Sequence, residues 1–205
     1  MLQDIAGFAV VAGLLTMVPG IDTAQVLRAA AMGGPARAYA TLAGIMTGVL
    51  VWGVAAALGI SALLVASRAA YDALRLAGAA YLLYLGIRII AASRYASIAT
   101  VSLERTWRLL PTFGRALLVT LTNPKNGLFY VAMLPQFLPS GLPAFAGGVL
   151  LAGVHDLECL LWFSMLIWST HRARAFLQRP TVQTWTERIS GAALVGFGLR
   201  VASER

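Results

Sequence analysis

The sequence predicts an all-α integral membrane protein of six transmembrane helices, arranged as two inverted repeats of three helices each. Of the 205 residues, 59% are hydrophobic and 12% are charged, whereas soluble domains carry about 25% charged residues. One soluble core of this size could not bury so much apolar surface. Apolar stretches long enough to cross a bilayer recur along the chain, and two of them are interrupted by proline. This pattern excludes a disordered chain and a disulfide-rich secreted domain, and it disfavours an ordinary soluble enzyme.

The spans follow from the apolar stretches, since a hydrocarbon core about 30 Å thick needs roughly 20 helical residues. We expect them at residues 2–31, 38–67, 69–92, 112–138, 144–170 and 185–202. Proline interrupts the first span at Pro19-Gly20 and the fourth at Asn123-Pro124. The third has a short uncharged middle, so the arginines at its ends are expected to extend toward the interfaces. The turn-forming residues 139–143 separate the fourth span from the fifth.

The chain is predicted to be a single transporter domain. Repeat 1 covers about residues 1–92, a polar link covers about 93–111, and repeat 2 covers about 112–205. With three spans each, the two repeats enter the membrane from opposite sides, as in many secondary transporters. The sixth span contains three glycines and carries Glu187 and Arg188 near its start. A five-span protein with an interfacial last segment is therefore the alternative.

Basic residues predict the orientation. The links between spans 1 and 2, 3 and 4, and 5 and 6 hold eleven arginines, against four on the opposite side. The eleven are Arg28, Arg37, Arg88, Arg94, Arg105, Arg108, Arg115, Arg172, Arg174, Arg179 and Arg188. The positive-inside rule then places these links in the cytoplasm of the cell and both termini outside it. The net charge of +8 fits this scheme better than nucleic-acid binding, because the bases are scattered between apolar runs.

The two proline breaks predict a binding site. Proline lacks an amide hydrogen and clashes with the preceding turn, so each helix is expected to divide there. The freed backbone groups must find partners or line a wet cavity. Asn123 can cap a new helix with Pro124 in its first position, and Asp22 could accept amide hydrogen bonds at the other break. The predicted substrate-binding residues are Pro19, Gly20, Asp22, Asn123, Pro124 and Lys125. Kinks used only for packing are the alternative.

Ionisable side chains at mid-membrane are expected to be functional, because a charge there costs at least about 2.5–3.5 kcal/mol. The candidates for proton coupling are Asp22, His155, Asp156 and Glu158. His155 and Glu158 share a helix face, whereas Asp156 and Glu158 point nearly oppositely. We therefore expect Glu158 and His155 to face the site. Interhelical hydrogen bonding by all three fifth-span residues is the alternative.

Lys125 is the one lysine among sixteen basic residues, and it lies at the centre of the fourth span. Its compact ammonium could pair with Asp22 across the two breaks. The hypothesis is that the two side chains form, or alternately break, an ion pair near the substrate.

At these residues the chain resembles the LysE/RhtB family of amino-acid exporters. The resemblance lies in four segments, in the family's order, at residues 17–22, 77–86, 121–137 and 191–196. It implies a multi-pass inner-membrane protein that exports amino acids or related metabolites and uses the proton-motive force. The family's first motif usually reads Pro-Gly-Pro-Asp, whereas here Ile21 replaces the second proline. Ile21 frees φ and restores an amide hydrogen.

The predicted function is therefore efflux of a small amino acid or analogue by proton antiport with alternating access. The expected partners are the substrate, protons and the lipid bilayer, with no nucleic acid, cofactor or bound metal. A homodimer is a further candidate, because Ala40, Gly44 and Gly48 form a small-residue stripe that permits close packing within or between subunits. The alternative function is export of a divalent metal cation by the acidic and His residues of the fifth span. The sequence contains no recognisable enzyme motif. It also has no disulfide or zinc framework, since Cys159 is the single cysteine.

Overall fold

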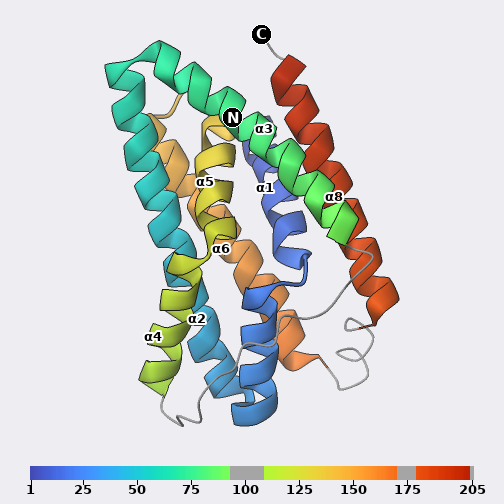
Figure 1. Cartoon of the computed structure of the whole chain (residues 1–205). Helices are drawn as coiled ribbons and strands as arrows, with labels where there is room; N and C mark the ends of the chain where they lie inside the picture. The colour runs from blue at the N-terminus through green and yellow to red at the C-terminus, as the bar shows by residue number, and fades with distance from the viewer. Residues whose placement is uncertain (93–108, 170–178, 204–205) are drawn as a thin grey trace.

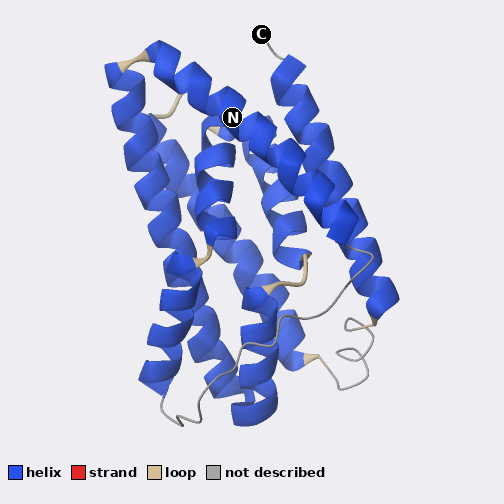
Figure 2. Cartoon of the chain, in the orientation of Figure 1, coloured by secondary structure: helices blue, strands red, loops and turns tan. Residues whose placement is uncertain are grey.

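The described residues of the computed structural model are all helical apart from short turns (Figure 2). They comprise residues 1–92, 109–169 and 179–203. The helices are α1 (Leu2–Met17), α2 (Ile21–Ala66), α3 (Arg68–Ala92), α4 (Leu109–Thr122), α5 (Pro124–Phe137), α6 (Ala144–Trp168) and α8 (Pro180–Ser203). The predicted link 93–111 overlaps α4 by three residues, and its remaining residues 93–108 lie outside the described part.

Both proline interruptions are present. The first separates α1 from α2 at residues 18–20, where Val18 and Gly20 have extended backbone angles. The second separates α4 from α5 at Asn123 alone. Figure 1 shows α1 and the first turns of α2 running one way, while α4 and α5 run the other way. The chain thus contains two interrupted rods of opposite direction.

The helix α2 reverses the chain without a loop. Gly34 has φ of 70°, which glycine adopts at little cost. Pro35 follows and begins the ascending part, where its missing amide hydrogen is harmless. In Figure 1 the two parts of α2 meet at the lower end of the molecule and run in opposite directions. They correspond to the end of the first predicted span and to the whole of the second.

Close glycine contacts hold the helices together. A Cβ added to Gly48 of α2 would lie 2.7 Å from Thr120 Cγ2, and one on Gly44 would meet the Phe113 carbonyl oxygen of α4. The predicted small-residue stripe therefore serves packing within the chain. A Cβ on Gly191 of α8 would likewise lie 2.7 Å from the Gly86 oxygen of α3.

Three described helical stretches are long and apolar enough to cross a membrane: Ile21–Leu63, Asp72–Ala91 and Ala144–Trp168. The apolar helices α1 and α4 are shorter, because the breaks divide the rods to which they belong. The last helix, α8, is not among these candidates, in line with its weak apolar signal. The N-terminus and the end of α8 lie at the same, upper end of the molecule in Figure 1.

Candidate functional site: a pocket between two helix breaks

The end of α1 is stabilised by side chains from distant elements. The last carbonyl groups of a helix have no partner within it, and here Leu15 O accepts a hydrogen bond from Lys125 Nζ at 3.3 Å. Leu14 O accepts one from Ser190 Oγ of α8 at 3.0 Å. An ammonium group also suits the negative end of the helix dipole. The first break is therefore completed by residues from the second half of the chain.

The second break is completed in a similar way. Asn123 is the N-cap of α5 and its Oδ1 accepts the amide hydrogen of Lys125 at 3.1 Å, with Pro124 opening the helix as expected. On the other side, the carbonyl of Thr120 accepts a hydrogen bond from Trp52 Nε1 of α2 at 3.4 Å. The indole ring packs against Gly127. Trp52 thus fills the gap between α4 and α5.

Asp22 does not cap α2. The N-cap is Gly20, and no side chain caps this helix end. Because Asp22 lies inside the first turn, its carboxylate points across to the other break, where Oδ2 accepts a hydrogen bond from Asn126 Nδ2 at 3.3 Å. The other oxygen, Oδ1, is buried and has no hydrogen-bond partner. Asp22 was expected to accept a hydrogen bond from a backbone amide at its own break, and instead it accepts one from Asn126 at the other break.

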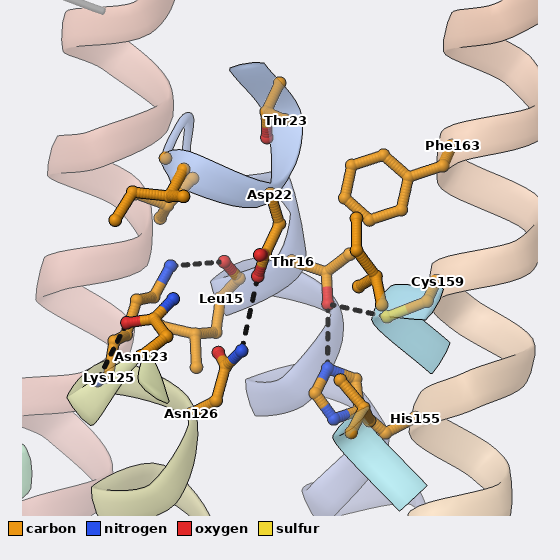
Figure 3. Close-up of a pocket in the computed structure, with 15 residues that line it drawn as sticks. Leu15, Thr16, Asp22, Thr23, Asn123, Lys125, Asn126, His155, Cys159 and Phe163 are labelled. Carbon is orange, nitrogen blue, oxygen red and sulfur yellow. Dashed lines mark hydrogen bonds between the residues drawn. The ribbon is translucent and has the colours of Figure 1, made fainter. Parts of the chain in front are cut away.

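The two breaks meet at one pocket, which has a cavity volume of about 40 Å³ in this conformation. It is lined by Leu15, Thr16, Val18, Gly20, Ile21, Asp22, Thr23, Ile45, Val49, Asn123, Lys125, Asn126, His155, Cys159 and Phe163. Figure 3 shows Asn123, Lys125 and Asn126 on one side and the α6 residues on the other. Asp22 and Thr16 lie between them.

His155 is buried with both ring nitrogens occupied. Nε2 is 3.0 Å from Thr16 Oγ1, and Nδ1 is 3.0 Å from Tyr130 OH. The Thr16 hydroxyl donates to Ala12 O and lies 3.9 Å from Cys159 Sγ. A chain of polar contacts therefore joins α5, α6 and α1 beside the pocket.

The structure brings most, but not all, of the predicted site residues together. Gly20, Asp22, Asn123, Lys125 and His155 line the pocket. Pro19 is not among the lining residues, although it makes the break, and Pro124 begins α5.

Asp156 and Glu158 do not line the pocket. Glu158 instead faces α1, because a Cβ on Gly13 would lie 3.4 Å from its Oε1. Asp156 Oδ1 and Glu158 Oε2 are buried without a hydrogen-bond partner. Of the two α6 residues expected to face the site, His155 lines the pocket and Glu158 does not. Helical spacing relates residues on one helix but does not say which neighbouring helix covers each face.

Sequence reasoning missed the polar residues Thr16, Asn126 and Tyr130. Asn126 lies in the segment 121–137 and could have been named from its position directly after Lys125. Nothing in the sequence pairs Thr16 or Tyr130 with His155, because the three residues come from separate helices.

Lys125 Nζ donates to the Leu15 carbonyl at 3.3 Å, and among the described residues no ion pair joins it to Asp22 in this structure. Both side chains line the same pocket, so an ion pair in another conformation stays a prediction. Among the residues that the structure describes, no three His, Cys, Asp or Glu side chains are grouped so as to hold a metal ion.

The family model described as LysE type translocator matches residues 14–205, which include both breaks and every residue that lines the pocket. The chain belongs to the LysE type translocator family. This LysE-type chain is a membrane transporter and not an enzyme.

The relatives of this translocator cover nearly its whole length. It is 27% identical over 208 residues to the uncharacterized membrane protein YrhP of Bacillus subtilis, covering 97% of this chain and 98% of YrhP. It is 29% identical to the homoserine/homoserine lactone efflux protein of Salmonella typhimurium, covering 94% of this chain and 92% of that relative. It is 28% identical to the leucine efflux protein of Salmonella choleraesuis, covering 92% and 90%. No solved structure matches the chain significantly.

Proposed function

We propose that this LysE-type translocator exports a small amino acid or analogue from the cytoplasm through the pocket between its two helix breaks. The observation that carries the proposal is that a base and an acid, Lys125 and Asp22, come from opposite breaks and line one pocket. A zwitterionic amino acid presents the complementary pair of charges on neighbouring atoms. Helix ends that face a cavity are also the usual means by which transporters hold carboxylate groups and ions.

The substrate carboxylate would bind Lys125 and the freed amides at the start of α2. Lys125 Nζ donates to Leu15 O at 3.3 Å, and a carboxylate would compete with this neutral acceptor because charge-assisted hydrogen bonds are the stronger ones. The substrate ammonium would bind Asp22, whose Oδ1 has no partner. Substrate binding would then exchange bonds that now join the two breaks for bonds to the substrate.

That exchange provides a means of alternating access. The bonds from Lys125 to Leu15 and from Asn126 to Asp22 connect segments from the two halves of the chain. Weakening both bonds together would allow one half to move against the other around the bound substrate. Proton antiport is the proposed coupling, with Asp22 and His155 as candidates at the pocket and Asp156 and Glu158 as candidates beyond it.

The proposed topology is six spans in two inverted halves, with both termini outside the cytoplasm. Two features support it. The first broken rod, α1 with the start of α2, runs opposite to the second, α4 with α5 (Figure 1). The reversal at Gly34 also separates the part of α2 that completes the first rod from the part that forms the second predicted span. The names of the relatives support the substrate class, since homoserine and leucine are both small amino acids.

Counterflow in proteoliposomes tests the proposal. The purified chain would be reconstituted, loaded with an unlabelled amino acid and supplied with the same amino acid in labelled form outside. We expect accumulation of label with the wild type, and a loss of at least about tenfold with Lys125→Met, because a charge-assisted bond is worth about 1.5–3 kcal/mol. Full exchange by Lys125→Met would contradict the proposed binding mode.

The matched control is Lys125→Arg, which keeps the positive charge and is expected to retain more exchange than Lys125→Met. An imposed pH gradient, acidic outside the vesicles, would test the coupling separately. Net efflux of amino acid from loaded vesicles that is indifferent to this gradient would refute proton antiport and leave the binding site intact.

A further inference from the structure

The pocket has two chemically different sides. One side carries the polar groups of the breaks, with Lys125, Asn123 and Asn126 facing Asp22 (Figure 3). The other side is formed by His155, Cys159 and Phe163, which lie at successive turns of α6. We call these three residues the α6 wall. They are almost completely buried, with exposed fractions of 6%, 3% and 2%.

The α6 wall offers no free charge to a ligand. Phe163 is apolar and Cys159 is a free thiol. The polar atoms of His155 are its two ring nitrogens, and these already contact the hydroxyl groups of Thr16 and Tyr130. The apolar side chains of Ile45 and Val49 from α2 complete the lining.

The acids of α6 do not change this picture. Asp156 and Glu158 are absent from the described lining residues, and Glu158 faces Gly13 of α1. A charged side chain that packed against the α6 wall would therefore lose hydration without gaining a partner, which is costly.

From this division we infer that the α6 wall contacts the side chain of the substrate and favours an uncharged one. Cys159 and Phe163 limit the size of the side chain that fits. The inference rests on the proposed function, because binding of the substrate's own ammonium and carboxylate at Asp22 and Lys125 directs its side chain toward α6. Asp22 and Lys125 are then occupied, so neither remains for a second charge on the ligand. Lysine, arginine, aspartate and glutamate are the substrates that this arrangement rejects.

Counterflow of a labelled panel in proteoliposomes tests the inference on the full chain. We expect exchange of alanine, serine or leucine to exceed that of lysine and glutamate by at least about tenfold. Phe163→Ala enlarges the pocket beside the α6 wall. It should raise the ratio of leucine to alanine exchange by about tenfold, the usual effect of one or two methylene groups in an apolar pocket. The matched control is Phe145→Ala, also on α6, since Phe145 is 43% exposed and does not line the pocket.

Two further measurements use Cys159, the single cysteine of the chain. Cys159→Asp adds a carboxylate to the wall and should admit lysine. In the wild type, a small methanethiosulfonate reagent should block exchange, and alanine should protect Cys159 from it where lysine does not. Labelling needs no variant and so remains informative if Cys159→Asp fails to fold.

The outcomes separate the two proposals. A wild type that exchanges no amino acid refutes the proposed function. Lysine exchange as fast as alanine exchange, an unchanged leucine-to-alanine ratio in Phe163→Ala, or labelling of Cys159 that alanine does not slow would each overturn the inference while leaving amino-acid export standing.

Discussion

At the scale of single residues, the site depends on side chains that satisfy groups left open by the helix breaks. Lys125 and Ser190 bind the last carbonyls of α1, Trp52 binds a carbonyl of α4, and Asn123 caps α5. Regular helical pairing stops at these breaks, and an unpaired backbone group in hydrocarbon costs several kcal/mol. These polar side chains therefore lie at the helix breaks, where they bind backbone groups.

The Tyr130 hydroxyl supports a prediction of this kind. Tyr130→Phe removes the partner of His155 Nδ1 in a fully buried position. We expect a loss of about 1–3 kcal/mol of stability, the usual cost of an unsatisfied buried polar group. Thermal unfolding in detergent measures it. Tyr84→Phe is the control, because Tyr84 is 54% exposed and should tolerate the change; equal losses in both variants would argue against the role of the His155 bond.

At the scale of helices, the position of the first break follows from local chemistry. Gly20 is the extended N-cap of α2, Ile21 is its first residue, and the first turn closes between Ala24 N and Gly20 O at 2.9 Å. The amide of Ile21 is not needed by the helix, and the first helical position is the one that accepts proline best. Ile21 therefore replaces the proline of the family motif at a position where the backbone accepts either isoleucine or proline.

We predict that Ile21→Pro folds and is as stable as the wild type or more stable, by up to about 1 kcal/mol, because proline restricts the unfolded chain. Leu27→Pro, two turns further along α2, should instead lose about 3 kcal/mol or more through a broken helix bond and a clash. Thermal unfolding of the two purified variants makes the comparison. Failure of Ile21→Pro to fold would contradict the assignment of Ile21 as the first helical residue.

The pairing of α3 with α8 supports a second prediction at this scale. A Cβ on Gly191 would lie 2.6 Å from Ile90 Cγ1 and 2.7 Å from the Gly86 oxygen, whereas one on Gly196 meets nothing within 4 Å. Gly191→Ala should therefore cost about 1–3 kcal/mol through overpacking. Gly196→Ala on the same helix should be neutral or stabilising, since alanine favours helix. Equal thermal midpoints for the two variants would mean that α3 and α8 do not pack this closely.

At the scale of the whole molecule, the sequence predicts the rods and their breaks, but not how neighbouring rods face one another. Hydropathy and proline position are local signals, and they placed the breaks at Pro19 and Asn123-Pro124. The partners of His155 and the orientation of Glu158 depend on which helix covers each face of α6. The reversal at Gly34 falls within residues 32–37, between the first two predicted spans, whereas its left-handed backbone does not follow from hydropathy.

The orientation of the molecule is open to a direct measurement. Eleven arginines in three links against four elsewhere predict that both termini lie outside the cytoplasm. Alkaline phosphatase fused to the C-terminus should be active in a bacterial host, and green fluorescent protein at the same position should be dark. The opposite pair of results would invert the topology and require the predicted direction of export to be reconsidered.

Synthesis of this chain imposes a delay that follows from the bond between Asn126 and Asp22. Their positions are 104 residues apart, so the ribosome releases the first break long before its partners exist. Until α5 emerges, the Leu15 carbonyl of α1 lacks Lys125, and until α8 emerges, the Leu14 carbonyl lacks Ser190. We therefore expect the insertion machinery to shelter the first rod in a hydrated channel, and a nascent chain truncated after α3 to be degraded rapidly by membrane proteases.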